Sequence, residues 1–134
     1  MKILIDTNVL ISTALFPHSV TARAYEKAMN GHYEVLICNY ELIEMIRVFN
    51  KKFPDRIYTL NQFLIALIHS VNIVDVPEGI SQYEIRDLKD EPILRTALHY
   101  DVDILLTGDK DFTSVGMCKP IVMIPAQFIE NDCL

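Results

Sequence analysis

The sequence predicts an α/β fold in which a parallel sheet lies between two layers of helices. Short apolar runs alternate with segments whose apolar residues recur every three or four positions, which is the spacing of one helix face. Several of the short runs are continuously apolar rather than alternating, as expected of strands that helices cover on both sides. Strands separated by single helices need crossover connections, and these favour a parallel sheet.

The expected strands are the short runs rich in Ile, Leu and Val. They are residues 3–5, 33–37, 71–76, 104–107 and 121–124. The fourth follows the helical segment 91–100 closely, as strand–helix alternation requires. Residues 75–89 contain Pro77 and Gly79 and show no period, so most of this segment is expected to be a loop within the domain.

The expected helices lie between the first four expected strands. They are residues 7–15, 20–29, 40–50, 60–70 and 91–100. Asn30 and Gly31 are an expected helix end, and Asn39 is the expected N-cap of the third helix. In that helix one apolar face is expected, formed by Leu42, Met45, Ile46 and Phe49. We expect core packing as the main use of Phe49 and Phe63.

Length and composition indicate one globular domain over residues 1–134. Hydrophobic residues make up 51% of the chain and charged residues 22%, a balance that excludes a disordered protein. No run approaches the roughly 18 apolar residues that span a bilayer. Asp6 interrupts the first apolar run before a signal peptide could form, so a cytoplasmic protein is expected.

The charge balance and the missing motifs exclude several function classes. There are 18 acidic and 12 basic residues, which argues against a generic basic nucleic-acid binder but not against an enzyme that uses cations. The cysteines form no C-x-x-C motif, which argues against a zinc–thiolate site, and the histidines show no metal-ligand spacing. These residues are Cys38, Cys118, Cys133, His18, His32, His69 and His99.

Acidic residues follow the strands at positions that could share one crevice. Asp6 comes directly after the first strand, and Asp109 comes just after the fourth. Asp90 stands at the start of the helix that leads into the fourth strand, and Glu44 lies early in the third helix. Because ligands bind beyond the carboxyl ends of parallel strands, we expect these four carboxylates to meet there.

Each acid also has a purely structural interpretation. Asp6 and Asp90 can serve as N-caps, and Asp109 and Asp111 can be turn residues. Glu44 lies almost opposite the expected apolar face of its helix, which predicts a solvated side chain. These alternatives remain open from the sequence.

Clustered carboxylates point to hard divalent cations. Close like charges raise one another's pKa unless a cation neutralises them, and oxygen donors select Mg²⁺ or Mn²⁺ over zinc. Two such ions about 3.5–4 Å apart can activate water and stabilise a leaving oxygen in phosphoryl hydrolysis.

A basic track for RNA could be formed by Arg47, Lys51, Lys52 and Lys110, with Arg56. The alternative is that these residues simply form a solvated helix end.

Three segments together resemble PIN-domain ribonucleases, in particular the VapC-like toxins of type II toxin–antitoxin modules. They are Asp6-Thr7-Asn8-Val9-Leu10 after the first strand, the helical segment 40–48, and the block from Arg86 to Phe112, which is the most specific. The resemblance spans nearly the whole chain. Leu88 departs from it, because relatives often have proline there, and Asp87 also looks like a family position.

The resemblance implies a three-layer α/β/α PIN-like fold with five parallel strands in the order 3-2-1-4-5. It implies a Mg²⁺- or Mn²⁺-dependent endoribonuclease, with an RNA substrate, a cognate antitoxin and a homodimer. It gives the catalytic and metal-binding set as Asp6, Glu44, Asp90 and Asp109. It gives a supporting set of Thr7, Asn8, Thr107 and Asp111.

Other functions stay open at this point. They include a PIN-domain RNA-processing nuclease outside a toxin–antitoxin module and a non-catalytic PIN-like scaffold. A phosphorylation-controlled receiver domain would need adjacent acids after the first strand, where Asp6 stands alone, and Asp75 is only a partial match. A phosphatase of the haloacid dehalogenase type would need a second Asp where Asn8 stands.

Overall fold

All five expected strands form, and they pair in parallel. The computed structural model describes residues 1–79, 90–109, 112 and 119–131. The strands are β1 (Lys2–Ile5), β2 (Glu34–Cys38), β3 (Asn72–Val74), β4 (Ile104–Leu106) and β5 (Ile121–Met123). Their order is β3-β2-β1-β4-β5, so the α/β fold and the strand order 3-2-1-4-5 are confirmed.

The expected helices also form, with small shifts at their ends. They are α1 (Thr7–Leu15), α2 (Val20–Asn30), α3 (Asn39–Lys52), α4 (Ile57–Ser70) and α5 (Glu91–His99), with a 3-10 turn at Pro54–Arg56. The helix α7 (Pro125–Glu130) was not expected. Its first turn is set by Pro125 and by the Gln127 side chain, which accepts a hydrogen bond from the backbone N–H of Ile124 at 3.1 Å. A helix this short leaves too little periodicity to predict.

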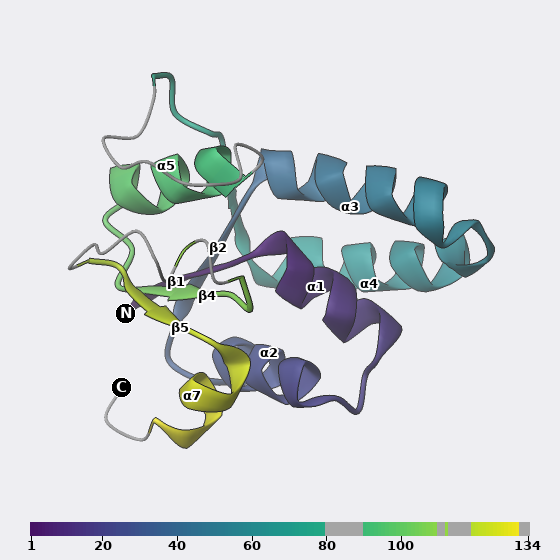
Figure 1. Ribbon diagram of the computed structural model, residues 1–134, viewed down its shortest axis with the longest axis horizontal. Helices are drawn as coiled ribbons and strands as arrows, with labels where there is room; N and C mark the ends of the chain where they lie inside the picture. The colour runs from purple at the N-terminus through teal and green to yellow at the C-terminus, as the bar shows by residue number, and fades with distance from the viewer. Residues whose placement is uncertain (80–89, 110–111, 113–118, 132–134) are drawn as a thin grey trace.

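Helices cover both faces of the sheet, so alternate strand residues enter two separate cores. In Figure 1, α5 lies on one side of the sheet, while α2 and α7 lie on the other. Ile3 and Ile5 pack in the core that includes α1, α2, α3 and α4, whereas Leu4 packs in the core that includes α5. Because both faces of the central strands β1, β2 and β4 are buried, these strands are apolar after their first residues, as their sequence indicated, whereas the edge strand β3 is largely exposed.

Helix α3 differs from its expected form at its start and on its buried face. Its N-cap is Cys38 rather than Asn39, so that prediction was wrong. The side chain of Glu41 accepts a hydrogen bond from the Cys38 backbone N–H at 3.2 Å, which fixes the earlier start. The buried face contains Glu41, Met45 and Phe49, while Ile46 is 44% exposed, so the expected face was wrong in part.

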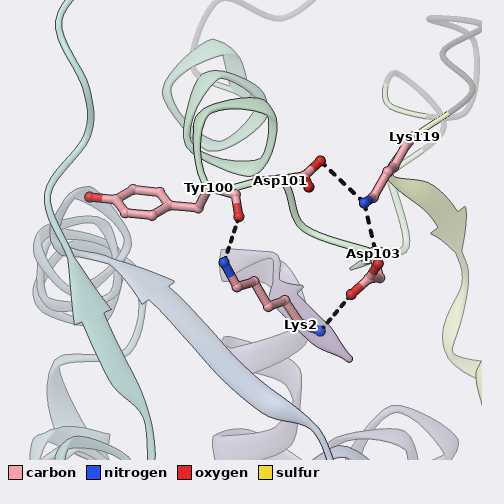
Figure 2. Close-up of polar contacts among 5 residues, drawn as sticks. All are labelled: Lys2, Tyr100, Asp101, Asp103 and Lys119. Carbon is pink, nitrogen blue, oxygen red and sulfur yellow. Dashed lines mark hydrogen bonds and ion pairs between the residues drawn. The ribbon is translucent and has the colours of Figure 1, made fainter.

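Polar contacts hold the amino ends of three strands together, at the edge opposite the carboxyl ends (Figure 2). The backbone N–H of Lys2 donates to Asp103 Oδ2 at 2.8 Å, and Lys2 Nζ donates to the Tyr100 carbonyl at 3.1 Å. Lys119 Nζ lies 3.1 Å from Asp101 Oδ1 and 3.4 Å from Asp103 Oδ1. Hydrogen bonding from Lys2 lowers the pKa of Asp103, and Lys119 adds to that effect. These contacts join the segments at the amino ends of β1, β4 and β5.

In the part of the chain that the structure describes, no helix has both the length and the apolar character needed to cross a membrane.

Phe49 is fully buried, and Phe63 packs against the larger core, so the expected packing of both residues in the core is confirmed. Cys38 is a buried free thiol, whereas Cys118 and Cys133 lie outside the described residues.

Candidate functional site

The four acids predicted from the sequence line a single cavity of about 280 Å³. The cavity lies where α1 and α5 begin, along one side of α3 and beside the segment after β4. The lining comprises Asp6, Thr7, Asn8, Ile11, Tyr40, Glu44, Arg47, Val48, Lys52, Asp90, Ile93 and Asp109. The structure therefore brings Asp6, Glu44, Asp90 and Asp109 together around one space, at the carboxyl edge of the sheet.

Thr107 links the two acids that follow β1 and β4. Its hydroxyl donates to Asp6 Oδ2 at 2.8 Å and accepts from the backbone N–H of Asp109 at 2.9 Å. Thr107 is fully buried and Asp6 is 1% exposed, so this link is shielded from solvent. Asp6 stands at the N-cap position of α1, but its side chain makes no capping hydrogen bond. The side-chain hydrogen bond that holds its carboxylate therefore comes from Thr107.

Burial makes the carboxyl group of Asp6 a weaker acid than usual. Its pKa rises from 3.8 to about 6, chiefly because burial removes water from the carboxylate. Hydrogen bonds from Thr107 and from the Thr7 backbone oppose the rise, and the charge of Asp109 adds to it. A buried carboxylate with an acid nearby is stabilised in its charged form by a cation.

Asp90 and Thr7 add further oxygen atoms to the wall of the cavity. Asp90 is 8% exposed and occupies the N-cap position of α5, yet its side chain makes no capping hydrogen bond. The hydroxyl oxygen of Thr7 is buried and has no hydrogen-bond partner among the residues that the structure describes. A buried hydroxyl in this state can accept a further ligand or a water molecule.

Glu44 lies on the cavity wall rather than in open solvent. Its side chain is 19% exposed, so the expectation of a solvated glutamate was wrong, because α3 is rotated relative to its expected face. Arg47 Nη2 lies 2.8 Å from Glu44 Oε2, and Arg47 Nε lies 3.1 Å from Glu44 Oε1. This bidentate pair neutralises the Glu44 carboxylate within the cavity wall.

Sequence reasoning missed a fifth acid, Glu41. It is fully buried, and both the backbone N–H and the thiol of Cys38 donate to its Oε1, at 3.2 Å and 3.4 Å. Burial raises its pKa well above the ordinary range, and the charge of Asp6 raises it further. The spacing of Glu41, Met45 and Phe49 by four residues each was the signal that could have placed this acid on the buried face.

The cavity suits a hydrated hard cation better than a closed metal cage. Within residues 1–79, 90–109, 112 and 119–131, no three His, Cys, Asp or Glu side chains form a group that could hold a metal ion. Mg²⁺ usually keeps several waters and takes only one or two carboxylates from the protein. The oxygen donors of Asp6, Asp109 and Thr7 fit that requirement. The four histidines are all exposed, and none lines the cavity.

The basic residues divide into those at the cavity and those elsewhere. Arg47 and Lys52 line it, whereas Lys51 is exposed at the end of α3 and does not. The predicted residues that fall outside the described residues are Asp87, Leu88, Lys110 and Asp111. The positive charge at the cavity therefore lies on the α3 side.

Comparison with known proteins gives a family match and a structural likeness. A family model described as PIN domain matches residues 2–111. A comparison with curated proteins finds no matching sequence. The fold is similar to that of a chain in the crystal structure of VapBC2 from Rickettsia felis bound to a DNA fragment from their promoter, with a TM-score of 0.72 and 14% identity. The alignment covers 92% of this chain and 98% of that one, and at this identity it shows a shared fold.

Proposed function

The chain belongs to the PIN domain family, and from this membership we propose that it is a metal-dependent endoribonuclease that hydrolyses RNA phosphodiester bonds. The observation that carries the proposal is the gathering of Asp6, Glu44, Asp90 and Asp109 around one cavity. A non-catalytic scaffold would not need a buried carboxylate whose pKa is raised to about 6 and which lies beside a second acid.

Mg²⁺ or Mn²⁺ is the proposed cofactor. Asp6 and Asp109 would hold the first ion, and Glu44 and Asp90 would complete the site or hold a second. When bound, such an ion supplies activation of water and neutralisation of the leaving oxygen. Thr107 fixes the orientation of the Asp6 carboxylate through its 2.8 Å hydrogen bond, and the unpartnered Thr7 hydroxyl offers a contact for water.

The RNA backbone would approach along α3. Arg47 and Lys52 line the cavity and are suited to phosphate oxygens, while Lys51 and Lys110 would extend the track. Asn8 lines the cavity and Asp111 lies two residues after Asp109 in the chain, and both would support the site. The net charge of −6 means that this local track, rather than the whole surface, must attract RNA.

The products of cleavage test this mechanism. Attack by an activated water should leave 5′-phosphate and 3′-hydroxyl ends, because the ribose 2′-hydroxyl takes no part. An oligonucleotide with a single 2′-deoxyribose at the cut position should therefore be cut at a rate within about threefold of the all-ribose substrate. Mass spectrometry of the fragments is the measurement. Finding 2′,3′-cyclic phosphate ends, or complete protection by the 2′-deoxy substitution, would contradict it.

Replacing Arg47 with methionine should affect metal and RNA in opposite directions. The change frees both oxygens of Glu44, so the Mn²⁺ concentration that half-saturates activity should fall severalfold. The same change removes a charge-assisted contact to phosphate, so KM for RNA should rise about tenfold. Arg23→Met on α2, an exposed position away from the cavity, is the matched control and should change neither value. Equal effects of the two variants would show that Arg47 serves neither metal nor RNA.

We further propose that the protein is the cytoplasmic toxin component of a toxin–antitoxin module and forms a homodimer. Structural similarity to a chain of a VapBC2 complex supports the antitoxin partner. Exposed apolar side chains offer a surface for a partner, namely Ile43 and Ile46 on α3 and Tyr58, Ile65 and Ile68 on α4. Co-expression with the protein of the adjacent gene should suppress cleavage and yield a stable complex. An adjacent gene without that effect would favour an RNA-processing nuclease outside such a module.

A further inference from the structure

Helix α3 uses two adjacent sides, one packed in the core and one on the cavity wall. The core side contains Glu41, Met45 and Phe49, which are fully buried. The cavity side contains Tyr40, Glu44, Arg47, Val48 and Lys52. At about 100° of turn per residue, Glu41 falls at the border between the two sides, almost one helical turn before Glu44. The rotation of α3 about its own axis therefore decides whether Glu44 faces the cavity.

The observed rotation of α3 is not the one that apolar burial alone would select. Ile43 and Ile46 are 63% and 44% exposed, while the carboxyl group of Glu41 is fully buried. Turning α3 by about 50° would bury Ile46 beside Met45 and would move Glu41 out of the core. Burial stabilises apolar surface and destabilises a carboxyl group, so both changes are favourable by themselves. In the turned helix Glu44 would point into solvent, as hydrophobic periodicity predicts.

The contact between Glu41 and Cys38 opposes this turn. Cys38 is the last residue of β2, where it pairs with Val74 of β3, and it is also the N-cap of α3. Glu41 Oε1 accepts hydrogen bonds from the backbone N–H of Cys38 at 3.2 Å and from its thiol at 3.4 Å. Because no loop separates the strand from the helix, these bonds fix the first turn of α3 relative to the sheet.

The Glu41–Cys38 contact lies at the same level of the sheet as Asp6. The parallel pairing of Leu4 with Leu36, continued by two residues, puts Cys38 across from Asp6. The charge of Asp6 acts on Glu41, which agrees with this placement. A rotation of α3 at this level would therefore change the separation between Glu44 and Asp6, two of the acids that line the cavity.

We propose that Glu41 is a positioning residue: its hydrogen bonds to Cys38 hold α3 in the rotation that places Glu44 and Arg47 on the cavity wall. What this wall does for metal and RNA rests on the proposed nuclease function. Replacing a residue that holds a metal ligand in place commonly weakens metal binding by about 10–100-fold. Glu41 lines no part of the cavity itself, so its effect must pass through α3.

Thiol labelling measures the rotation and needs no enzymatic activity. Ile46→Cys places a thiol on the exposed face of α3, and Glu44→Cys places one on the cavity wall. Peptide mass spectrometry counts N-ethylmaleimide labelling at each position separately from the natural cysteines. Adding Glu41→Leu to each protein should slow labelling at position 46 and speed it at position 44, each by about threefold or more.

Two further variants show whether the hydrogen bonds of Glu41 cause the change. Glu41→Gln keeps a carbonyl oxygen that can accept from the Cys38 N–H, so both labelling rates should stay within about twofold of wild type. Met45→Leu alters the next residue of the same buried side at similar volume and should also keep both rates. Faster labelling at both positions in the Glu41→Leu proteins would mean that Glu41 only stabilises α3. Unchanged rates would mean that other contacts fix the rotation, and either result overturns the proposal.

Calorimetric titration with Mn²⁺ measures the consequence for the cavity. Glu41→Leu should raise the Kd for Mn²⁺ about tenfold, and Glu41→Gln should keep the wild-type value. In a Glu44→Gln protein the same Glu41→Leu change should alter Kd by less than about twofold, because the ligand that Glu41 positions is already lost. A full tenfold loss in that background, or an unchanged Kd in the single variant, would contradict a role through Glu44.

The two measurements separate failure of this inference from failure of the nuclease proposal. If the wild-type protein cuts RNA and the labelling rates do not respond to Glu41→Leu, the positioning role is wrong and the nuclease proposal stands. If the wild-type protein neither binds Mn²⁺ nor cuts RNA, the nuclease proposal is wrong, and labelling still decides whether Glu41 sets the rotation of α3. If Glu41→Leu does not fold, as judged by circular dichroism, Glu41→Met replaces it.

Discussion

Replacing Asp6 with asparagine should abolish RNA cleavage and, at neutral pH, stabilise the metal-free protein. Asp6 is 1% exposed and its pKa is raised from 3.8 to about 6 by burial. The folded state therefore holds the proton more tightly than the unfolded state does. The resulting stability is complete below pH 3.8 and is lost as the pH rises through about 6. Above that pH the buried charge costs on the order of 2–3 kcal/mol, which asparagine does not incur.

Thermal unfolding at several pH values, in the presence of a chelator, measures this effect. The wild-type melting temperature should fall between about pH 4 and pH 6, and Asp6→Asn should remove most of that fall. Asp103→Asn is the matched control at the opposite edge of the sheet. The pKa of Asp103 is lowered, so its contribution is present above the ordinary value of 3.8 and is lost in acid. That variant should therefore destabilise the protein at pH 7 while keeping cleavage.

Two results would contradict this prediction. A fully active Asp6→Asn protein would remove Asp6 from the proposed catalytic set. A variant that is inactive but less stable than wild type at pH 7 would show that the Asp6 carboxylate serves packing rather than chemistry. A carboxylate that destabilises the metal-free folded protein is expected to be retained where that carboxylate serves function.

The sequence predicted the framework of the site well because strand ends are simple to locate. Asp6 and Asp109 follow short apolar runs, and parallel pairing of β1 with β4 brings such positions to one edge. Asp90 was predicted from its place at the start of a helix, and the structure adds that its side chain does not cap that helix. Strand pairing thus carries most of the information about the candidate site.

The face of α3 could not be predicted correctly from hydrophobicity alone. Ile43 and Ile46 are exposed, while Glu41 is buried beside Met45 and Phe49, so the apolar residues mark the buried face only in part. A buried acid is rare without a partner, and Glu41 finds its hydrogen bonds at the N-cap residue Cys38, which periodicity does not reveal. The misplaced face led directly to the wrong expectation of a solvated Glu44.

Adding Mn²⁺ should raise the melting temperature of the wild-type protein strongly. A ligand that binds only the folded state stabilises it by about 2.7 kcal/mol at 100 times its Kd, which corresponds to roughly 10 °C for a chain of this size. The shift should be larger at pH 7.5 than at pH 5, because the ion must displace the proton that Asp6 holds below about pH 6.

Variants distinguish binding at the cavity from binding elsewhere on an acidic protein. Asp6→Asn and Asp109→Asn each remove a proposed ligand, so both should reduce the Mn²⁺-induced shift by half or more. Asp103→Asn removes the same charge at the amino edge of the sheet and should keep the full shift. An equal shift in all three variants would mean that Mn²⁺ binds the surface generally. That outcome would contradict the proposed chemistry, which depends on a cation bound in the cavity. Among the described residues that line the cavity there are carboxylates but no histidine that could act as a base in place of the cation.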